Sequence, residues 1–299
     1  MAFFSEKGGV GKSTFTLMFA SWLHKHGVKV GVVDFNKRLT EYRKDEITVM
    51  KANGTYSDEL IDSAWPLIPL DRSFVSQFVP PVPGYAMWVE HLIKEGELKD
   101  LDVLIPDFPG AISGREIMQL LMYRMVNLVV VPFDRDQQAM GAALAVKNML
   151  RQMEGCRFCG FLNMVQTAYG RKSDYQKIAE VMMKQGLPML PDMVSFSERM
   201  KQFEKVDMMR STFSYPDWDS PAFKGSRDLG IENLFLDIAR ELKSVPNFRG
   251  TEPADLSFVD SLVKGNSIAD MNRQLCGTSF PQYELDLPED MKLKFKKNK

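Results

Sequence analysis

The sequence is poor in cysteine and histidine and has no long apolar run. Three cysteines among 299 residues fit a reducing compartment and exclude a disulfide framework. No stretch approaches the ~18 apolar residues of a membrane span, and the first residues lack the pattern of a signal peptide. An excess of one charge is also absent, because 38 basic residues against 39 acidic ones give a net charge of −1. We therefore expect a soluble, cytoplasmic protein whose overall charge favours neither nucleic acid nor an acidic partner.

Apolar runs with strand character alternate with helical patterns through most of the chain. Such alternation predicts an α/β fold, in which a mostly parallel twisted sheet is flanked by helices on both faces. We predict one domain over residues 1–243, with an irregular insertion over residues 55–95 that carries one or two short helices. A polar C-terminal extension with a basic tail follows over residues 244–299. The predicted strands are residues 1–4, 28–34, 101–107, 127–133 and 158–165, and the predicted helices include residues 138–150 and 228–243.

The stretch SEKGGVGKST, residues 5–14, places three glycines and two lysines between the first strand and a helical pattern. These glycines let successive backbone N–H groups turn inward around a phosphate, and the following helix points its positive end at the same place. Lys12 supplies a cation for the β- and γ-phosphates, and the Ser13 hydroxyl is placed to ligate Mg²⁺. The loop is thus predicted to bind a nucleoside triphosphate. The predicted contacts are Gly8, Gly9, Val10, Gly11, Lys12, Ser13 and Thr14.

Two of the predicted strands end in a carboxylate, Asp34 and Asp107. The carboxyl ends of parallel strands meet at one edge of a sheet, where open α/β sheets bind their ligands. Both carboxylates are therefore expected to lie beside the glycine loop.

The loop departs from the general pattern G-x-x-x-x-G-K-[ST], because Glu6 stands at the first glycine position and a second lysine, Lys7, precedes Gly8. It resembles the deviant phosphate loop of the ParA/MinD ATPases, and the chain looks like ParA-like proteins of bacterial plasmids and conjugative elements. The resemblance covers roughly residues 2–243 and implies a P-loop NTPase that hydrolyses ATP with Mg²⁺. It also implies an ATP-bound homodimer, in which Lys7 of each chain reaches the nucleotide of the other.

The resemblance assigns roles to further positions. Asp107, in the segment LIPDFPG, would hold Mg²⁺ through water, and Asn163 would contact adenine. Pro191 and Asp192 match the short loop that closes over the base. The metal site would then comprise Ser13 and Asp107, and the catalytic group Lys7, Lys12, Asp34 and Asn36.

Asn36 departs from the family pattern, which has Asp-x-Asp where this chain has Asp34-Phe35-Asn36. In the family the second aspartate orients or activates the attacking water. An asparagine is neutral at any pH, so it positions a water without acting as a base. We therefore predict slow hydrolysis and a long-lived ATP-bound state.

Basic residues after the base-closing loop form a candidate surface for non-specific DNA binding, as this region does in ParA proteins. The alternative is that these charges are only solvated. The C-terminal KLKFKKNK lacks the sustained apolar face of an amphipathic membrane helix, so we predict no MinD-like membrane anchor. The candidate DNA-binding residues are Arg199, Lys201, Lys205 and Arg210.

Cys156 and Cys159 are spaced like a metal or redox pair. In the iron–sulfur carriers of the family such a pair follows the strand that ends in asparagine, whereas here it precedes and enters that strand. Four ligands cannot be assembled in one chain from these residues, so we predict that neither binds metal.

Three functions stay open. The first is a ParA-type ATPase that binds DNA or a partner protein only when ATP-bound, is reset by a stimulating partner, and acts in partition or in maintenance or transfer of a mobile element. The second is a metabolic or metal-cofactor-assembly enzyme on the same fold. The third is a nearly inactive, nucleotide-gated adaptor.

Overall fold

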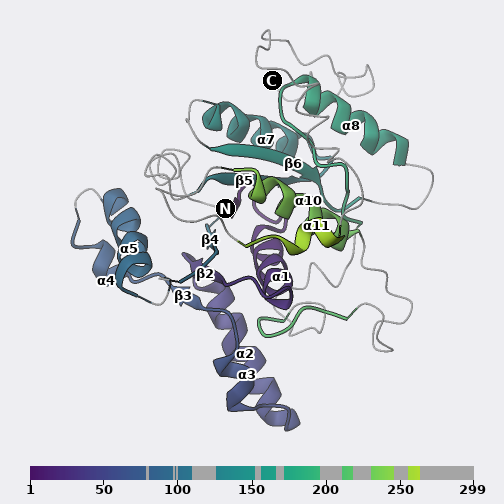
Figure 1. Cartoon of the computed structure of the whole chain (residues 1–299). Coiled ribbons are helices and arrows are strands. Elements are labelled where there is room, and N and C mark those ends of the chain that lie inside the picture. The colour runs from purple at the N-terminus through teal and green to yellow at the C-terminus, as the bar shows by residue number, and fades with distance from the viewer. Residues whose placement is uncertain are drawn as a thin grey trace.

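The computed structural model (Figure 1) describes residues 1–78, 81–96, 98, 100–109, 126–151, 156–165, 172–195, 211–217, 230–245 and 255–262. Its strands form two three-stranded parallel sheets, with the orders β1-β5-β6 and β3-β2-β4. The α-amino group of Met1 donates a hydrogen bond to the carbonyl oxygen of Leu104 at 2.8 Å, which places β1 beside β4 and joins the two sheets. The strands are β1 (Ala2–Phe3), β2 (Val30–Asp34), β3 (Leu67–Pro69), β4 (Val103–Asp107), β5 (Leu128–Phe133) and β6 (Arg157–Leu162).

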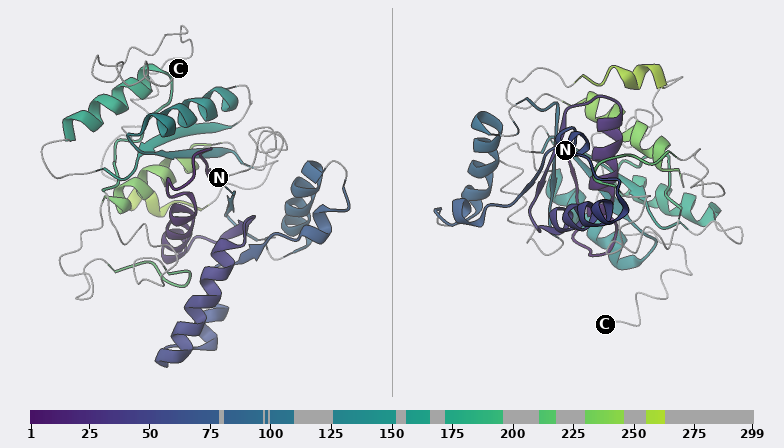
Figure 2. Two further views of the ribbon diagram at one scale, coloured as in Figure 1. Left: turned by 180° about the vertical axis from the view of Figure 1, so that it is seen from behind. Right: turned by 90° about the horizontal axis from the view of Figure 1, so that it is seen from below.

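Helices cover both faces of the joined sheets, as Figures 1 and 2 show. One buried cluster contains residues of α1, α10 and α11, and the other contains residues of α5, α7 and α8. The two clusters meet at the sheet, where Val32 of β2 belongs to the first and its neighbour Val33 to the second. The predicted α/β fold is therefore confirmed. The helices of these layers are α1 (Lys12–Lys25), α5 (Pro81–Glu95), α7 (Gln137–Leu150), α8 (Lys172–Lys184), α10 (Ile231–Lys243) and α11 (Phe258–Leu262).

Residues 55–95 contain more regular structure than the predicted irregular insertion with one or two short helices. The segment carries α3 (Asp58–Asp62), α4 (Arg72–Val75) and α5, and between α3 and α4 lies β3. β3 pairs in parallel with β2, with Ile68 opposite Val33, so the segment also extends the sheet. β3 is only three residues long, follows Pro66 and ends in Pro69, so it has no periodicity from which it could have been predicted.

Part of the predicted polar C-terminal extension packs on the domain. The ring of Phe258 in α11 stacks on that of His26 at a centroid distance of 4.7 Å and contacts Trp22 at 5.5 Å. Leu256 and Val259 are buried in the same cluster as α1. The described residues of this extension, 244–245 and 255–262, thus contribute to the core.

The arm, which we define as α2 (Arg38–Asn53) together with α3, projects beyond the sheet (Figures 1 and 2). Only Leu39, Tyr42 and Glu46 of α2 are buried, and all three lie within its first nine residues. The last seven residues of α2 therefore lie largely in solvent.

Among the described residues, no helix combines the length and apolar composition that crossing a bilayer requires.

Candidate functional site

The glycine loop connects β1 to the N-terminus of α1. Gly9 and Gly11 adopt left-handed backbone conformations, with φ of 76° and 92°, which other residues rarely tolerate. A Cβ at Gly11 would also come within 2.9 Å of the Phe15 ring and 3.0 Å of Asn163 Nδ2. α1 has no side-chain cap and no acidic residue in its first turn, so its own residues supply no negative charge to the positive end of its dipole. The loop and this helix end form a setting suited to an anion.

Lys12, the first residue of α1, is buried with an exposed fraction of 7%. Its Nζ donates a hydrogen bond to the carbonyl oxygen of Lys7 at 2.8 Å, which folds its side chain back over the loop. Burial lowers the pKa of Lys12, and the nearby Asp107 carboxylate opposes that shift. The ammonium group is therefore held close to where a phosphate would lie.

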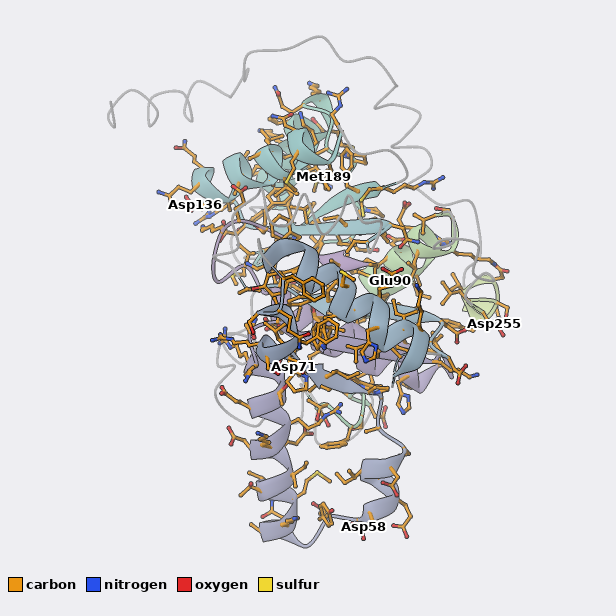
Figure 3. The ribbon with its side chains drawn as sticks, turned by 90° about the vertical axis from the view of Figure 1, so that its left-hand side faces the viewer. Asp58, Asp71, Glu90, Asp136, Met189 and Asp255 are labelled. Atoms are coloured by element: carbon orange, nitrogen blue, oxygen red, sulfur yellow. The ribbon has the colours of Figure 1, made fainter. Side chains whose placement is uncertain are left out.

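Lys7 is bound by two carboxylates that follow β5. Its Nζ lies 3.5 Å from Asp134 Oδ1 and also donates to Asp136 Oδ2. Partial burial lowers the pKa of Lys7, but the bond to Asp136 and the charge of Asp134 outweigh it and raise the pKa overall. Asp136 is also the N-cap of α7, as its position in Figure 3 shows. The second lysine of the loop is thus held within its own chain.

Asp107 lies at the end of β4, beside the start of α1. Its Oδ2 accepts hydrogen bonds from Ser13 Oγ at 2.8 Å and from Asn36 Nδ2 at 3.2 Å, whereas its Oδ1 has no hydrogen-bond partner. The residue is completely buried, and this burial raises the pKa of Asp107 to about 7, with the bond from Ser13 acting in the opposite direction. An unpartnered buried carboxylate oxygen is unfavourable unless a cation or water binds it.

Asp34 lies at the end of β2, in register with Asp107 of β4. Its Oδ2 accepts two hydrogen bonds from Thr40, one from the backbone N–H and one from the hydroxyl, both at 2.8 Å. Its Oδ1 accepts a bond from the Asn36 N–H at 3.3 Å. Burial raises the pKa of Asp34, and these bonds partly offset that effect. Asp34 therefore organises the turn between β2 and α2.

Asn163 follows β6 and reaches the glycine loop. Its Nδ2 donates to the carbonyl oxygen of Val10 at 3.0 Å, and its Oδ1 accepts from the Met164 N–H at 2.8 Å. Pro191 and Asp192 lie in a segment that runs beside β6, where the Val194 N–H donates to the Leu162 carbonyl at 2.9 Å. The structure therefore brings the loop, both strand-end carboxylates, Asn36 and Asn163 to the carboxyl edge of the sheet.

Cys156 and Cys159, for which the sequence predicts no metal binding, lie away from this site. Cys159 is buried in β6 with an exposed fraction of 2%, and burial raises the pKa of Cys156 to about 11. In the part of the chain that the structure describes, no group of three or more His, Cys, Asp or Glu side chains is arranged to hold a metal ion. The four candidate DNA-binding residues, Arg199, Lys201, Lys205 and Arg210, lie outside the described residues.

Three residues of the site were missed from the sequence: Thr40, Asp134 and Asp136. Asp136 had a detectable signal, because an aspartate before a helical pattern is a common N-cap. Asp134 and Thr40 had none, since their roles depend on contacts with residues distant along the chain or across a turn.

Comparison with known proteins identifies the domain. The model of the CobQ/CobB/MinD/ParA nucleotide-binding domain matches residues 1–265. The chain belongs to this family. The CobQ/CobB/MinD/ParA domain has the P-loop NTPase fold, so the fold predicted from the glycine loop is confirmed.

The proteins to which this chain is similar bear different names. The iron–sulfur cluster carrier protein of Pyrococcus abyssi is 26% identical over 178 residues, which cover 52% of this chain and 57% of that protein. The chain thus spans little more than half the length of the curated relatives that it matches. The MinD cell division protein of Aquifex aeolicus superposes with a TM-score of 0.54 at 16% identity, over 83% of this chain and 98% of that one. A putative plasmid partition protein of Borrelia burgdorferi bound to AMPPNP gives a TM-score of 0.51 at 18% identity, over 80% and 97%. These two likenesses show the shared fold.

Proposed function

We propose that the chain is a Mg²⁺-dependent ATPase of the ParA type, which dimerises around two ATP molecules and binds DNA or a partner protein only in that state. The observation that carries the proposal is the glycine loop with two lysines, placed beside a buried carboxylate that has one open oxygen. The cycle would serve partition of a replicon, or maintenance or transfer of a mobile element.

The nucleotide would bind over the N-terminus of α1. Loop N–H groups and the helix dipole hold the phosphates, and Lys12 would exchange its bond to the Lys7 carbonyl for one to the β- and γ-phosphates. Asn163 already lies against the loop, where its amide suits the edge of a base. The residues proposed to bind ATP are Gly8, Gly9, Val10, Gly11, Lys12, Ser13, Thr14, Asn163, Pro191 and Asp192.

The residues present fit Mg²⁺. This ion prefers oxygen ligands and keeps several waters, and here the hydroxyl of Ser13 lies beside a carboxylate whose Oδ1 is unpartnered. Ser13 and Asp107 would hold the ion, Asp107 through water. When bound, Mg²⁺ would neutralise charge on the β- and γ-phosphates.

Lys7 would act in the dimer, by reaching the nucleotide of the partner chain. In the single chain it is held by Asp134 and Asp136, so this ion pair must open before the lysine crosses the interface. Dimerisation would then supply a cation that the isolated chain withholds from its own site.

Hydrolysis would be slow because Asn36 has no carboxylate with which to activate water. We expect Asn36→Asp to raise the turnover number, measured as phosphate release under saturating Mg·ATP. A wild-type turnover that matches Asp-x-Asp relatives and does not change in Asn36→Asp would contradict this expectation.

A carrier of metal clusters is the second candidate, because the curated relatives bear that name. A cluster shared between two chains requires accessible cysteines, and Cys159 is buried within β6. The geometry therefore favours the nucleotide switch.

The deciding experiment measures retention of the protein on random-sequence duplex DNA with ATP, with ADP and without nucleotide, over a salt series. Retention only with ATP, falling steeply as salt rises and lost in Lys12→Ala, supports a nucleotide-gated DNA binder. Lys44→Ala, an exposed lysine of α2, is the control and should keep retention. No retention in any state removes DNA as the target and leaves a protein partner.

A further inference from the structure

The turn between β2 and α2, residues 34–40, is folded around Asp34. Both oxygens of Asp34 accept hydrogen bonds from this turn, from Asn36 N–H and from Thr40. Lys37 at its centre has φ of 64°, a left-handed conformation that costs a non-glycine residue free energy and persists only where neighbouring contacts hold it. The turn therefore fixes the backbone at Asn36.

The side chain of Asn36 faces Asp107 on the neighbouring strand. Its Oδ1 accepts a hydrogen bond from the Arg38 N–H at 2.8 Å, and its Nδ2 donates to Asp107 Oδ2 at 3.2 Å. The acceptor that would orient a water is thus engaged by the turn, while the donor reaches across to β4.

We propose that Asn36 is a positioning residue for Asp107, which it holds by Oδ2 so that Oδ1 alone is presented to Mg²⁺ and its waters. Ser13 holds the same Oδ2 from the other side. The inference rests on the proposed function, since it assigns the orientation of the carboxylate in that metal site. Residues that orient the ligands of a metal fix the geometry of the site, so their loss lowers the affinity for the metal.

An amide suits this position better than a carboxylate. Asp34 and Asp107 are both completely buried, and each charge disfavours the other. A third carboxylate at position 36 would add repulsion and could not donate to Asp107 when ionised. The amide supplies the donor without the charge.

The test measures binding of AMPPNP by calorimetry over a Mg²⁺ series and, separately, in EDTA. We expect Asn36→Ala to raise the half-saturating Mg²⁺ concentration about 10–100-fold, the usual effect of losing such a positioning contact. Nucleotide affinity in EDTA should stay unchanged, because the hydrogen bonds of Asn36 in the described structure go to Asp34, Asp107 and Arg38 and to no residue of the glycine loop. Asn53→Ala, at the exposed end of α2, is the matched control and should behave as wild type.

A second variant distinguishes the loss of this hydrogen bond from a general loss of folding. Asn36→Ser keeps a shorter donor, so its Mg²⁺ requirement should lie between those of wild type and Asn36→Ala. An unchanged Mg²⁺ requirement in both variants would overturn the inference, as would an Asn36→Asp protein with faster turnover and an unchanged requirement. If wild type binds no AMPPNP even at saturating Mg²⁺, the proposed function fails and the inference fails with it.

Discussion

Buried carboxylates in this chain differ mainly in the donors that surround them. Asp34 accepts three hydrogen bonds from its own turn, and Glu46 of α2 accepts three from Ser211 and Thr212. Asp237 of α10 is also buried, but its partners are Arg240 at 3.4 Å and another carboxyl group, that of Asp192. Burial and the charge of Asp192 together raise the pKa of Asp237 to about 7, against the opposing effect of Arg240. Ionising Asp237 therefore works against folding.

This gives a prediction for stability against pH. The pKa of Asp237 in the folded chain lies above the unfolded value of 3.8, so the folded state binds more protons between about pH 4 and pH 7. The stabilisation from the protonated group is present below about pH 4 and is lost as pH rises to 7. Asp237→Asn removes this loss, and relative to wild type it should gain roughly 1–4 kcal/mol in free energy of unfolding between pH 5 and pH 8. Urea denaturation at the two pH values measures it.

The exposed Asp45→Asn is the control for Asp237→Asn and should show no such change. An equal difference between Asp237→Asn and wild type at both pH values would mean that Asp237 does not titrate in this range.

At the scale of elements, α2 links the candidate site to residues 211–217. Thr40, in the first turn of α2, is hydrogen-bonded to Asp34. Arg43 and Glu46, about one and two turns further along the helix, are hydrogen-bonded to Thr212 of this segment. Arg43 donates to the carbonyl oxygens of Trp65 and Thr212, both at 3.0 Å, and its guanidinium lies over the Trp65 ring at 4.4 Å. A displacement of Asp34 would therefore be transmitted along α2 to this segment.

Substitution of Glu46 tests the link between α2 and residues 211–217. Glu46→Ala leaves the Thr212 N–H and hydroxyl buried without an acceptor, which should cost about 2–4 kcal/mol in free energy of unfolding. Glu46→Gln retains one acceptor oxygen and should lose less, and the exposed Glu41→Ala of the same helix should change stability by about 0.5 kcal/mol or less. Chemical denaturation of the three variants checks the order. Equal losses in Glu46→Ala and Glu41→Ala would rule out the link.

α5 is linked to both strand ends through aromatic rings. Phe35 follows Asp34, Phe108 follows Asp107, and their ring centroids lie 5.1 Å apart. Phe35 also contacts Tyr85 and Trp88 of α5, at ring-centroid distances of 5.8 and 6.0 Å. Any shift of the two carboxylates on nucleotide binding should thus reach Trp88.

Tryptophan fluorescence reports that shift. We expect Mg·AMPPNP to change the emission of the wild-type chain and Trp88→Phe to reduce the change, leaving the part that Trp65 reports through Arg43. Trp22→Phe should retain the full change, because Trp22 belongs to the cluster on the opposite face of the sheet. A change as large in Trp88→Phe as in wild type would show that α5 does not sense the site.

At the scale of the whole molecule, α11 packs against the end of α1 and against α10. Its Phe258 covers Trp22 and His26 at the end of α1, and Lys243 of α10 pairs with Asp260. The family match ends at residue 265, just after this helix. The folded domain thus extends further than the residue-243 boundary predicted from the sequence.

Truncation tests the role of α11. A chain that ends at residue 254 loses the buried side chains of Leu256 and Val259, which should cost about 3–6 kcal/mol in free energy of unfolding. A chain that ends at residue 265 keeps α11 with both of these side chains, so it is the matched control. Thermal and urea melts compare the two, and equal stability of the two truncated chains would place α11 outside the cooperative unit.

A feature could be predicted from the sequence when the residues that determine it lie close together along the chain. The strands other than β3, the glycine loop and the strand-end carboxylates were predictable because each depends on a few consecutive residues. The contacts that set their chemistry join residues far apart, 129 positions for Lys7 with Asp136 and 71 for Asn36 with Asp107. No local pattern marks such pairs, so they could be identified only once the strands were paired.

The projecting arm makes small movements at Asp34 during the proposed ATP cycle detectable by a distance measurement. A 16-residue helix is about 24 Å long, so a rotation of about 5° at Asp34 would carry the far end of α2 through about 2 Å. At that end the backbone N–H groups of Gly54 and Thr55 donate hydrogen bonds to carbonyl oxygens of the preceding turn, and both residues are exposed. A spectroscopic label attached there would therefore be displaced further than the residues at the β2 end, whose own movements are too small to follow directly.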